Sequence, residues 1–276
     1  MWLTDISERP SVAAIQQEQA PHLQMGYESY IICTSPRSGS TLLCQLLTNT
    51  NVAGVPNSYF HKPSLANWME VHGIAPNSLG NRSETLEAVL KKAHKTGTAE
   101  TGVFGLRIQG GSLNYFMDQL KLLHPEQNSD VERLNATFGE TAFIFLSRKN
   151  KLEQAISCVK AMQTGLWHTA ENGTEFERLA PPQPPYFDAK AIRQHIAEFE
   201  EDDQRWEHWF TKESIQPLRL SYEDLAKDSV ATLNTVLEAL GLQTSSTIGT
   251  KAPLAKMANE LNKEWATLYR TIPNQI

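Results

Sequence analysis

The sequence predicts an α/β fold, with a mostly parallel central sheet flanked by helices and built as one domain. Short apolar runs alternate along the chain with segments of helical period, which is the pattern of strand–helix–strand units. The run 142–146 is apolar at every position, as a central parallel strand covered on both faces requires. The length of 276 residues suits one large domain, and no internal repeat or low-complexity segment divides it.

Four short runs have the length and composition of strands. They span residues 30–33, 102–108, 142–146 and 217–220. Before the first of them, residues 1–26 are polar and weakly patterned. We therefore expect an N-terminal arm over 1–26 and a domain over 27–276.

Helices are expected between these strands, where apolar side chains recur every three or four positions. They cover residues 42–47, 83–97, 113–123, 150–162, 188–210, 228–241 and 254–269. Ser83 is expected to cap the second of these helices, and Asn150 with Glu153 resembles a capping box at the fourth. Residues 165–187 have no period and contain a proline-rich run at 181–185, so we expect an irregular loop with a functional role.

Composition narrows the class of protein. Hydrophobic residues make up 40% and charged residues 20%, which excludes disorder over most of the chain. The 25 basic and 31 acidic residues give a net charge of −6, so no general affinity for nucleic acid or a membrane surface is expected. No apolar run approaches the roughly 18 residues of a membrane span. The three cysteines form no CxxC pair and the N-terminus has no secretory pattern, which together predict a cytoplasmic protein without a zinc site.

The segment 30–47 carries the clearest sign of chemistry. A buried strand ends and a helix begins there, joined by Pro36, Arg37, Ser38, Gly39, Ser40 and Thr41. The backbone N–H groups of such a turn and the positive end of the helix dipole converge on one concavity. Arg37 adds a full charge in a fork geometry, and the three hydroxyl side chains add donors. The loop is therefore predicted to bind a phosphate or a similar anion.

Two common phosphate-binding patterns do not describe this loop. It has one glycine and no lysine before Ser40, so it is not the GxxxxGK[ST] motif. It contains no GxGxxG, which argues against a dinucleotide-dependent oxidoreductase. An alternative stays open, in which serines cap the helix and Arg37 forms a surface ion pair.

A second anion site is expected at the end of the strand 142–146. Arg148 follows that strand, and Ser157 lies in the next helix. In a doubly wound sheet, ligands bind beyond the carboxyl ends of the strands, so Arg37 and Arg148 can face one crevice. Two anion sites in one crevice indicate a ligand with two separated phosphates. The alternative is that Arg148 pairs with Glu153 and that Ser157 is an ordinary helix serine.

These residues resemble the sulfotransferases that use 3′-phosphoadenosine 5′-phosphosulfate (PAPS). The segment 36–43 resembles their 5′-phosphosulfate loop, and Arg148 with Ser157 is similar to their 3′-phosphate motif. Within that superfamily, the chain is most similar to the bacterial trehalose 2-sulfotransferase family. The shared pattern is collinear over about residues 28–270 and recurs at 52–54, 56–60, 102–105, 163–167, 221–225 and 264–270.

The resemblance implies a P-loop nucleotide-kinase-like sheet and a PAPS-dependent transferase that uses no metal and releases 3′,5′-adenosine bisphosphate (PAP). It implies that donor binding falls to Pro36, Arg37, Ser38, Gly39, Ser40, Thr41, Arg148, Ser157 and Lys256. Arg37 also counts as catalytic, because charge accumulates on the leaving 5′-phosphate. The partner is expected to be a small hydroxyl acceptor, such as a carbohydrate or a metabolite. The family also suggests a homodimer.

The chain departs from the family at residue 55. The family carries a glutamate after its Ala-Gly pair as the general base, whereas here Val55 follows Gly54. Val55 cannot take a proton. His61 is the nearest titratable residue, and an unperturbed imidazole suits the task, so we predict His61 as the candidate base.

The acceptor side and two other functions complete the expectations. Residues 165–187 are expected on the acceptor side, and the predicted acceptor contacts are Tyr59, Phe60, Arg107 and Trp167. One alternative function is a nucleotide-binding relative that has lost transfer, which the change at Val55 favours. A nucleotide-dependent kinase has less support. It needs a loop lysine and a magnesium-binding acid after a strand, and neither is evident in the sequence.

Overall fold

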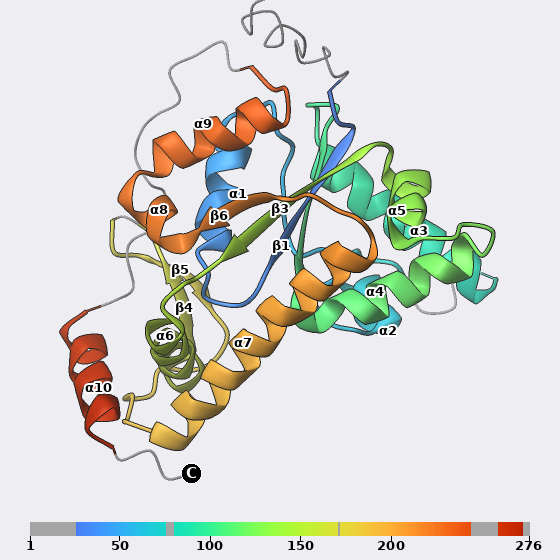
Figure 1. Cartoon of the computed structure of the whole chain (residues 1–276). Coiled ribbons are helices and arrows are strands. Elements are labelled where there is room, and N and C mark those ends of the chain that lie inside the picture. Colours follow the sequence, from blue (N-terminus) through green and yellow to red (C-terminus); the bar gives the residue numbers. More distant parts are fainter. Residues whose placement is uncertain (1–25, 76–79, 171, 244–258, 273–276) are drawn as a thin grey trace, which may run out of the picture.

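The computed structural model describes residues 26–75, 80–170, 172–243 and 259–272 (Figure 1). Its central sheet contains β1 (Ser29–Thr34), β2 (Phe104–Gln109), β3 (Thr141–Ser147) and β6 (Leu218–Ser221). The strands are ordered β2-β1-β3-β6, and each neighbouring pair is parallel. The predicted parallel sheet is confirmed, and its strands begin and end within two residues of the predicted runs.

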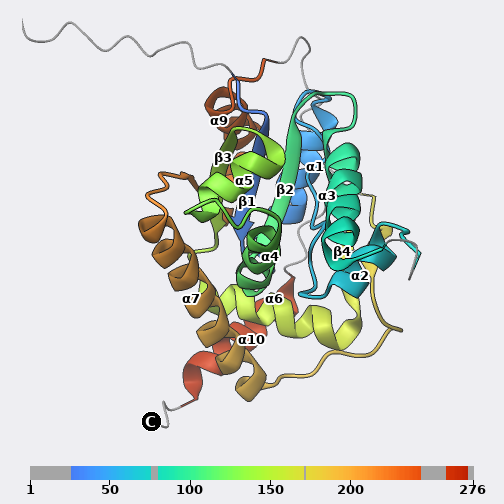
Figure 2. The ribbon, with the colours of Figure 1, turned by 90° about the vertical axis from the view of Figure 1, so that its right-hand side faces the viewer.

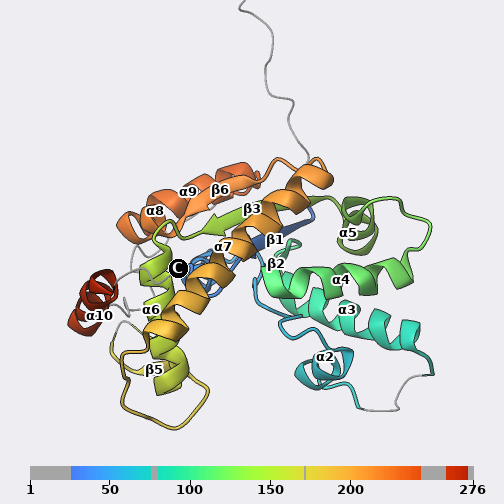
Figure 3. The ribbon, with the colours of Figure 1, turned by 60° about the horizontal axis from the view of Figure 1, so that its bottom comes forward.

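Helices cover both faces of the sheet because side chains alternate along β1. Tyr30 and Ile32 join one apolar cluster, and Ile31 and Cys33 join another. The first cluster includes α1 (Ser40–Asn49), α8 (Tyr222–Lys227) and α9 (Ser229–Ala239). The second includes α4 (Gly110–Leu123), α5 (Asp130–Phe138) and α7 (Ala189–Lys212). Figure 3 shows α8 and α9 on one side of the strands and α4 and α7 on the other.

The remaining elements lie around this core. Next to β2 lies α3 (Arg82–Thr98), as Figure 2 shows, and α2 (Leu65–Val71) packs beside α3. A third apolar cluster joins α7 to α6 (Lys151–Thr164) and α10 (Glu260–Thr271). An antiparallel hairpin of β4 (Leu166–Thr169) and β5 (Glu175–Arg178) follows α6 and contributes Trp167 to that cluster. This hairpin brings a separate segment of the chain to the carboxyl end of the parallel sheet.

The structure corrects several sequence predictions. Residues 165–187 are not wholly irregular, since they contain the hairpin; its strands have four residues each and register shifts, so no alternation is visible in the sequence. Asn81 caps α3 in place of Ser83. The short helices α2, α5 and α8 were not predicted, because so few turns give no clear period. The described part of the last helix runs from Glu260 to Thr271. The predicted arm over 1–26 lies outside the described residues except for Gly26.

The capping box predicted at α6 is only half present. The Asn150 side chain accepts a hydrogen bond from the backbone N–H of Glu153 at 3.0 Å. The Glu153 carboxylate does not return to Asn150; it pairs with Arg148 at 3.4 Å. The backbone N–H of Asn150 donates to Glu223 instead, at 3.1 Å. Glu223 thus ties α8 to the start of α6, on the same side of the sheet as the predicted second anion site.

Gly54 holds the segment that follows α1 against β2. Its φ is +69°, and a Cβ there would lie 2.3 Å from the Val103 carbonyl oxygen and 2.4 Å from that of Gly97. The next residue, Val55, donates its backbone N–H to Gly97 at 2.7 Å. Asn57 then forms a parallel bridge with Leu106 of β2. Only glycine allows this close approach, so it fixes where residues 55–58 lie.

We expect Gly54→Ala to destabilise the fold more than Gly102→Ala does. Gly102 also has positive φ, at +79°, but a Cβ there would meet nothing within 4 Å. Gly102→Ala should therefore cost only the left-handed strain, about 1–2 kcal/mol. Gly54→Ala should cost about 1–3 kcal/mol more, because two carbonyl oxygens must move. Urea unfolding of both variants measures the difference, and equal losses would contradict the packing argument.

Candidate functional site

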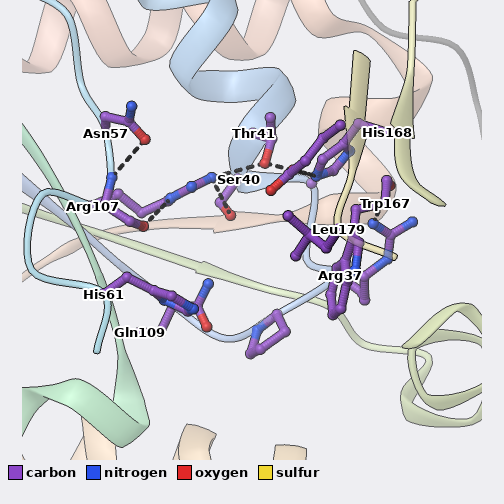
Figure 4. Close-up of a pocket in the computed structure, with 14 residues that line it drawn as sticks. Arg37, Ser40, Thr41, Asn57, His61, Arg107, Gln109, Trp167, His168 and Leu179 are labelled. Atoms are coloured by element: carbon purple, nitrogen blue, oxygen red, sulfur yellow. Dashed lines mark hydrogen bonds and ion pairs between the residues drawn. The ribbon is translucent and has the colours of Figure 1, made fainter. Parts of the chain in front are cut away.

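A cavity of about 340 Å³ lies at the carboxyl ends of β1 and β2 (Figure 4). Its walls come from the β1–α1 loop, the segment after Gly54, the end of β2 and the hairpin. The lining residues are Pro36, Arg37, Gly39, Ser40, Thr41, Asn57, Ser58, His61, Arg107, Gln109, Trp167, His168, Glu177 and Leu179. Figure 4 shows Trp167, His168 and Leu179 on one side and Asn57, His61 and Gln109 on the other. The position is the one at which ligands bind in open parallel sheets.

The β1–α1 loop has the backbone geometry of an anion site. Arg37 and Gly39 have φ of 62° and 84°, so left-handed residues flank Ser38. A non-glycine residue with such a φ is uncommon and clusters at functional sites. The first turn of α1 contains no acidic residue, and none of the described side chains caps its N-terminus. These backbone N–H groups are therefore available to an anion, which the helix dipole also favours.

Neighbouring helices fix the shape of this loop. The side chain of Gln154, fully buried in α6, donates hydrogen bonds to Ser35 Oγ at 2.9 Å and to the Pro36 carbonyl at 2.7 Å. On the other side, a Cβ on Gly39 would lie 2.7 Å from the ring of Tyr222. The loop is thus held between α6 and α8. Its concavity is formed before any ligand arrives, which lowers the entropic cost of binding.

Arg107 crosses from β2 to the loop. Its Nε donates to Ser58 Oγ at 2.8 Å, and its Nη1 donates to Thr41 Oγ1, also at 2.8 Å. Its backbone N–H donates to the Asn57 carbonyl at 3.0 Å. Thr41 Oγ1 lies in turn 3.0 Å from His168 Nε2 on the hairpin. One hydrogen-bonded chain therefore links β2, the loop helix and the hairpin across the cavity, as the dashed lines of Figure 4 show.

Arg37 joins the two predicted anion sites. Its Nε donates to Ser157 Oγ at 3.0 Å, and its Nη1 donates to the Trp167 carbonyl at 2.6 Å. Arg148 lies behind it, with Nη1 donating to the Arg37 carbonyl at 3.4 Å. The alternative for Arg148 is realised in part, because Arg148 also pairs with Glu153, whereas Ser157 accepts from Arg37 and is not an ordinary helix serine. The two sites are nevertheless adjacent.

Arg148 is buried and incompletely paired. Only 7% of the residue is exposed, and its guanidinium lies 4.3 Å from the centre of the Tyr222 ring. Its Nε is buried and has no hydrogen-bond partner among the described residues. A buried N–H left unsatisfied costs free energy, and on a cation it attracts an anionic acceptor. The donor set at this point thus suits a phosphate.

The site concentrates positive charge. Burial lowers the pKa of Arg37, and the adjacent charge of Arg148 lowers it further. Burial and the charge of Arg37 lower the pKa of Lys160 in the same way. The pKa of His168 falls to about 3, because the ring is buried and lies near the charges of Arg37 and Arg107. A bound anion would relieve this mutual repulsion.

The structure brings most of the predicted site residues together. Those that line the cavity are Pro36, Arg37, Gly39, Ser40, Thr41, His61, Arg107 and Trp167. The prediction that the Ser38 hydroxyl is a donor in the anion site is wrong. This residue is fully buried, and its hydroxyl lies 2.5 Å from Thr34 Oγ1, so it faces the sheet rather than the cavity. Ser157 and Arg148 lie beside the cavity, behind Arg37. Lys256 lies outside the described residues.

Tyr59 and Phe60 are core residues rather than acceptor contacts. They are 6% and 2% exposed and belong to the apolar cluster that includes Phe104 and Phe116. The Tyr59 hydroxyl donates to the Val55 carbonyl at 2.6 Å. Burial raises the pKa of Tyr59 to about 12, so this hydroxyl stays protonated. The pair anchors the cavity wall from behind.

Other cavity residues were not predicted from the sequence. They are Asn57, Ser58, Gln109, Glu177 and Leu179. Gln109 ends a predicted strand, which is a usable signal for a ligand contact. The other four lie in irregular or weakly patterned segments, where spacing carries no signal.

Comparison with known proteins identifies the family. Residues 29–271 match the family described as Stf0 sulphotransferase, which covers most of the chain. The chain is a member of the Stf0 sulfotransferase family. This agrees with the resemblance seen in the phosphate-loop and Arg148 motifs.

Two curated relatives of this sulfotransferase are named trehalose 2-sulfotransferase. The protein from Mycolicibacterium smegmatis is 24% identical over 259 residues, covering 88% of this chain and 94% of the relative. The protein from Mycobacterium tuberculosis is 24% identical over 261 residues, covering 87% and 94%.

Solved sulfotransferase structures also match this sulfotransferase at low identity. The sulfotransferase domain of the Synechococcus PCC 7002 olefin synthase has a TM-score of 0.41 and 16% identity, covering 95% of this chain and 94% of that one. A sulfotransferase from Alicyclobacillus acidocaldarius has a TM-score of 0.42 and 14% identity, covering 87% and 90%.

Two kinds of feature are absent from the described residues. None of the described helices combines the length and apolarity needed to cross a bilayer. Within the same ranges, no cluster of three or more His, Cys, Asp or Glu side chains could hold a metal ion.

His168 should make this sulfotransferase sensitive to acid. Its ring stays neutral in the folded protein down to a pH of about 3, whereas in the unfolded chain it takes a proton near its ordinary pKa of 6.5. The unfolded state therefore binds more protons between these values, and the free energy of unfolding falls as pH is lowered through them. The slope from this one group reaches about 1.4 kcal/mol per pH unit.

We expect His168→Gln to make this pH dependence shallower. Glutamine can keep a hydrogen bond to Thr41 but does not titrate. Urea unfolding between pH of about 7 and about 4 measures the slope. His195→Gln, which changes a histidine on α7 outside the cavity, is the control. A variant slope equal to that of the parent would contradict the assignment of a buried, neutral ring.

Proposed function

We propose that this protein transfers a sulfuryl group from PAPS to a hydroxyl group of a carbohydrate. The observation that carries the proposal is the convergence of Arg37, Arg107 and Arg148 on the uncapped N-terminus of α1. The loop and Arg37 would bind the 5′-phosphosulfate, and Arg148 with Ser157 would bind the 3′-phosphate. Membership of a sulfotransferase family supports this reading over other anion-binding functions.

Sulfuryl transfer depends mainly on positioning the two reactants and on stabilising the charge that develops, and it needs no covalent intermediate with the protein. In-line sulfuryl transfer resembles phosphoryl transfer, with a loose transition state and charge on the leaving oxygen. Arg37 and the backbone amides at the start of α1 would stabilise that charge, and one such donor contributes about 3–4 kcal/mol. Because arginine and amide groups supply this charge, the proposal includes no metal.

The acceptor side of the cavity favours a polar, neutral ligand. Asn57, Ser58 and Gln109 provide amide and hydroxyl groups, and Trp167 provides an aromatic ring. Such a mixture of a flat apolar surface and hydrogen-bonding groups suits a sugar. The names of the curated relatives make trehalose the first acceptor to test. The cytoplasmic location and the homodimer stay predictions from the sequence.

A nucleotide-binding protein without transfer is the second candidate. Val55 has no proton acceptor in its side chain and is not among the residues that line the cavity. This observation favours the candidate only if no other residue accepts the proton. His61, the base predicted from the sequence, lines the cavity and its residue surface is largely open to solvent. Partial desolvation of its ring against the cavity wall lowers its pKa, and the charges of Arg107 and Lys62 lower it further.

Binding and transfer measurements test the proposal together. PAP should bind in the presence of EDTA, more tightly than ATP does, because the 3′-phosphate meets Arg148. PAP at 100 times its dissociation constant should stabilise the fold by about 2.7 kcal/mol in thermal unfolding. Sulfur-labelled PAPS should give labelled product with trehalose or another member of a sugar panel. Tighter, magnesium-dependent binding of ATP would indicate a kinase, and PAP binding without any transfer would indicate the binding protein.

Arg148→Ala should separate the two phosphate sites. Losing a charge-assisted contact should weaken PAP binding about 10- to 100-fold. Binding of adenosine 5′-phosphate, which has no 3′-phosphate, should change far less. Calorimetry with both ligands gives the comparison. Arg219→Ala removes an arginine that pairs with Glu207 outside the cavity, and serves as the control. Equal losses for the two ligands would make Arg148 a structural residue.

A further inference from the structure

Glu177 is the only carboxylate among the described residues that line the cavity. It comes from β5 of the hairpin, more than 100 residues from the phosphate loop. Its Oε2 lies 3.5 Å from His168 Nε2, and 41% of its side chain is exposed. The carboxylate is therefore part of the cavity wall and still reaches solvent.

We propose that Glu177 is the general base of the transfer reaction, with His168 as its positioning residue. The inference rests on the proposed sulfuryl transfer. Glu177, on the hairpin, would accept the proton of the acceptor hydroxyl, which the Val55 side chain cannot do.

The hydrogen-bonded chain across the cavity defines the role of His168. His168 Nε2 lies 3.0 Å from Thr41 Oγ1 and 3.5 Å from Glu177 Oε2. A ring proton on Nε2 faces both oxygens, so Nε2 is the donor and the ring is neutral, in agreement with its low pKa. Such a ring is a poor proton acceptor at neutral pH. His168 can hold the Glu177 side chain in place, but it is not suited to take the substrate proton.

Charged and titratable side chains of the cavity surround Glu177. Its negative charge raises the pKa of Arg37 on the phosphate loop and that of His61 on the facing wall. The charged and titratable groups around it are His168 on β4, Arg37 on the loop, and His61 and Arg107 across the cavity. Among these groups Glu177 is the one carboxylate, and a carboxylate within reach of the acceptor hydroxyl can take its proton.

The transfer step needs only PAPS, the acceptor hydroxyl and Glu177. The acceptor oxygen forms a bond to sulfur as the bond between sulfur and the 5′-phosphate oxygen breaks. The leaving phosphate keeps the electron pair of the broken bond, and the hydroxyl proton passes to a Glu177 oxygen. The products are a sulfate ester, PAP and a protonated Glu177. Because the side chain is partly exposed, this proton can return to solvent.

The test is the transfer rate of Glu177→Gln with labelled PAPS. Trehalose is the acceptor probe, replaced by the best sugar of the panel if trehalose is inert. We expect kcat to fall about 10²- to 10⁴-fold, the usual contribution of a general base. PAP affinity should not fall, because the Glu177 carboxylate offers no hydrogen-bond donor to a phosphate and its negative charge lies near Arg37. Glu177→Asp, which keeps a carboxylate, should recover part of the rate.

The pH profile distinguishes a base from a structural residue. In the parent, turnover should fall as pH is lowered, because a protonated carboxyl group cannot accept a proton. In Glu177→Gln, that limb should be absent. His168→Gln should lower kcat by a smaller factor and keep the limb. Glu198→Gln is the matched control: Glu198 pairs with His195 at 2.7 Å on α7, outside the cavity, and its loss should leave kcat unchanged.

Three outcomes would overturn or separate the claims. If Glu177→Gln turns over as fast as the parent, Glu177 is not the base. If His61→Ala instead loses the rate and the low-pH limb while Glu177→Gln keeps both, His61 is the base. If the parent transfers no label to any acceptor, the proposed function fails, whatever the Glu177 variants do.

Discussion

The parallel register of β1, β2 and β3 is the constraint on which the site depends. It aligns Thr34 with Gln109 on one side and with Leu146 on the other, so all three strands end at one edge. Arg37, Arg107 and Arg148 lie at or just beyond those ends. Buried like charges repel, and the unfolded chain would separate them. The sheet, Gln154 and Tyr222 hold them together instead. An anion bound between the arginines would offset their mutual repulsion.

The sequence was most informative where structure is local. The strand, loop and helix over 29–49 follow from a short apolar run, a Ser/Gly turn and a helical period, all within one window. The direction of a single hydroxyl is not local, however. The Ser38 hydroxyl turns into the sheet because Thr34 offers it a partner there, whereas the Thr41 hydroxyl, three positions later, accepts from Arg107 and faces the cavity. A residue pattern cannot distinguish these two cases.

The acceptor side could not be predicted for a different reason. Its residues come from segments that meet only in the folded chain: Arg37 bonds the carbonyl of Trp167, 130 positions away. The hairpin strands are too short and too irregular to show alternation, so Glu177 carried no signal. Tyr59 and Phe60 show the opposite error. Their place in a family pattern suggested contact with a ligand, whereas the aromatic cluster around Phe116 buries them.

The hairpin is closed at its base. Leu179 donates its backbone N–H to Gly165 at 2.8 Å, and Arg178 bonds the Thr164 carbonyl at 2.6 Å. Gly165, with φ of +70°, has no room for a side chain against Ala180. Everything between these points forms a module whose length and composition can change without moving the parallel sheet. One wall of the cavity can therefore change while the β1–α1 loop stays the same, so the ligand group that meets this wall can differ between proteins that share the sheet.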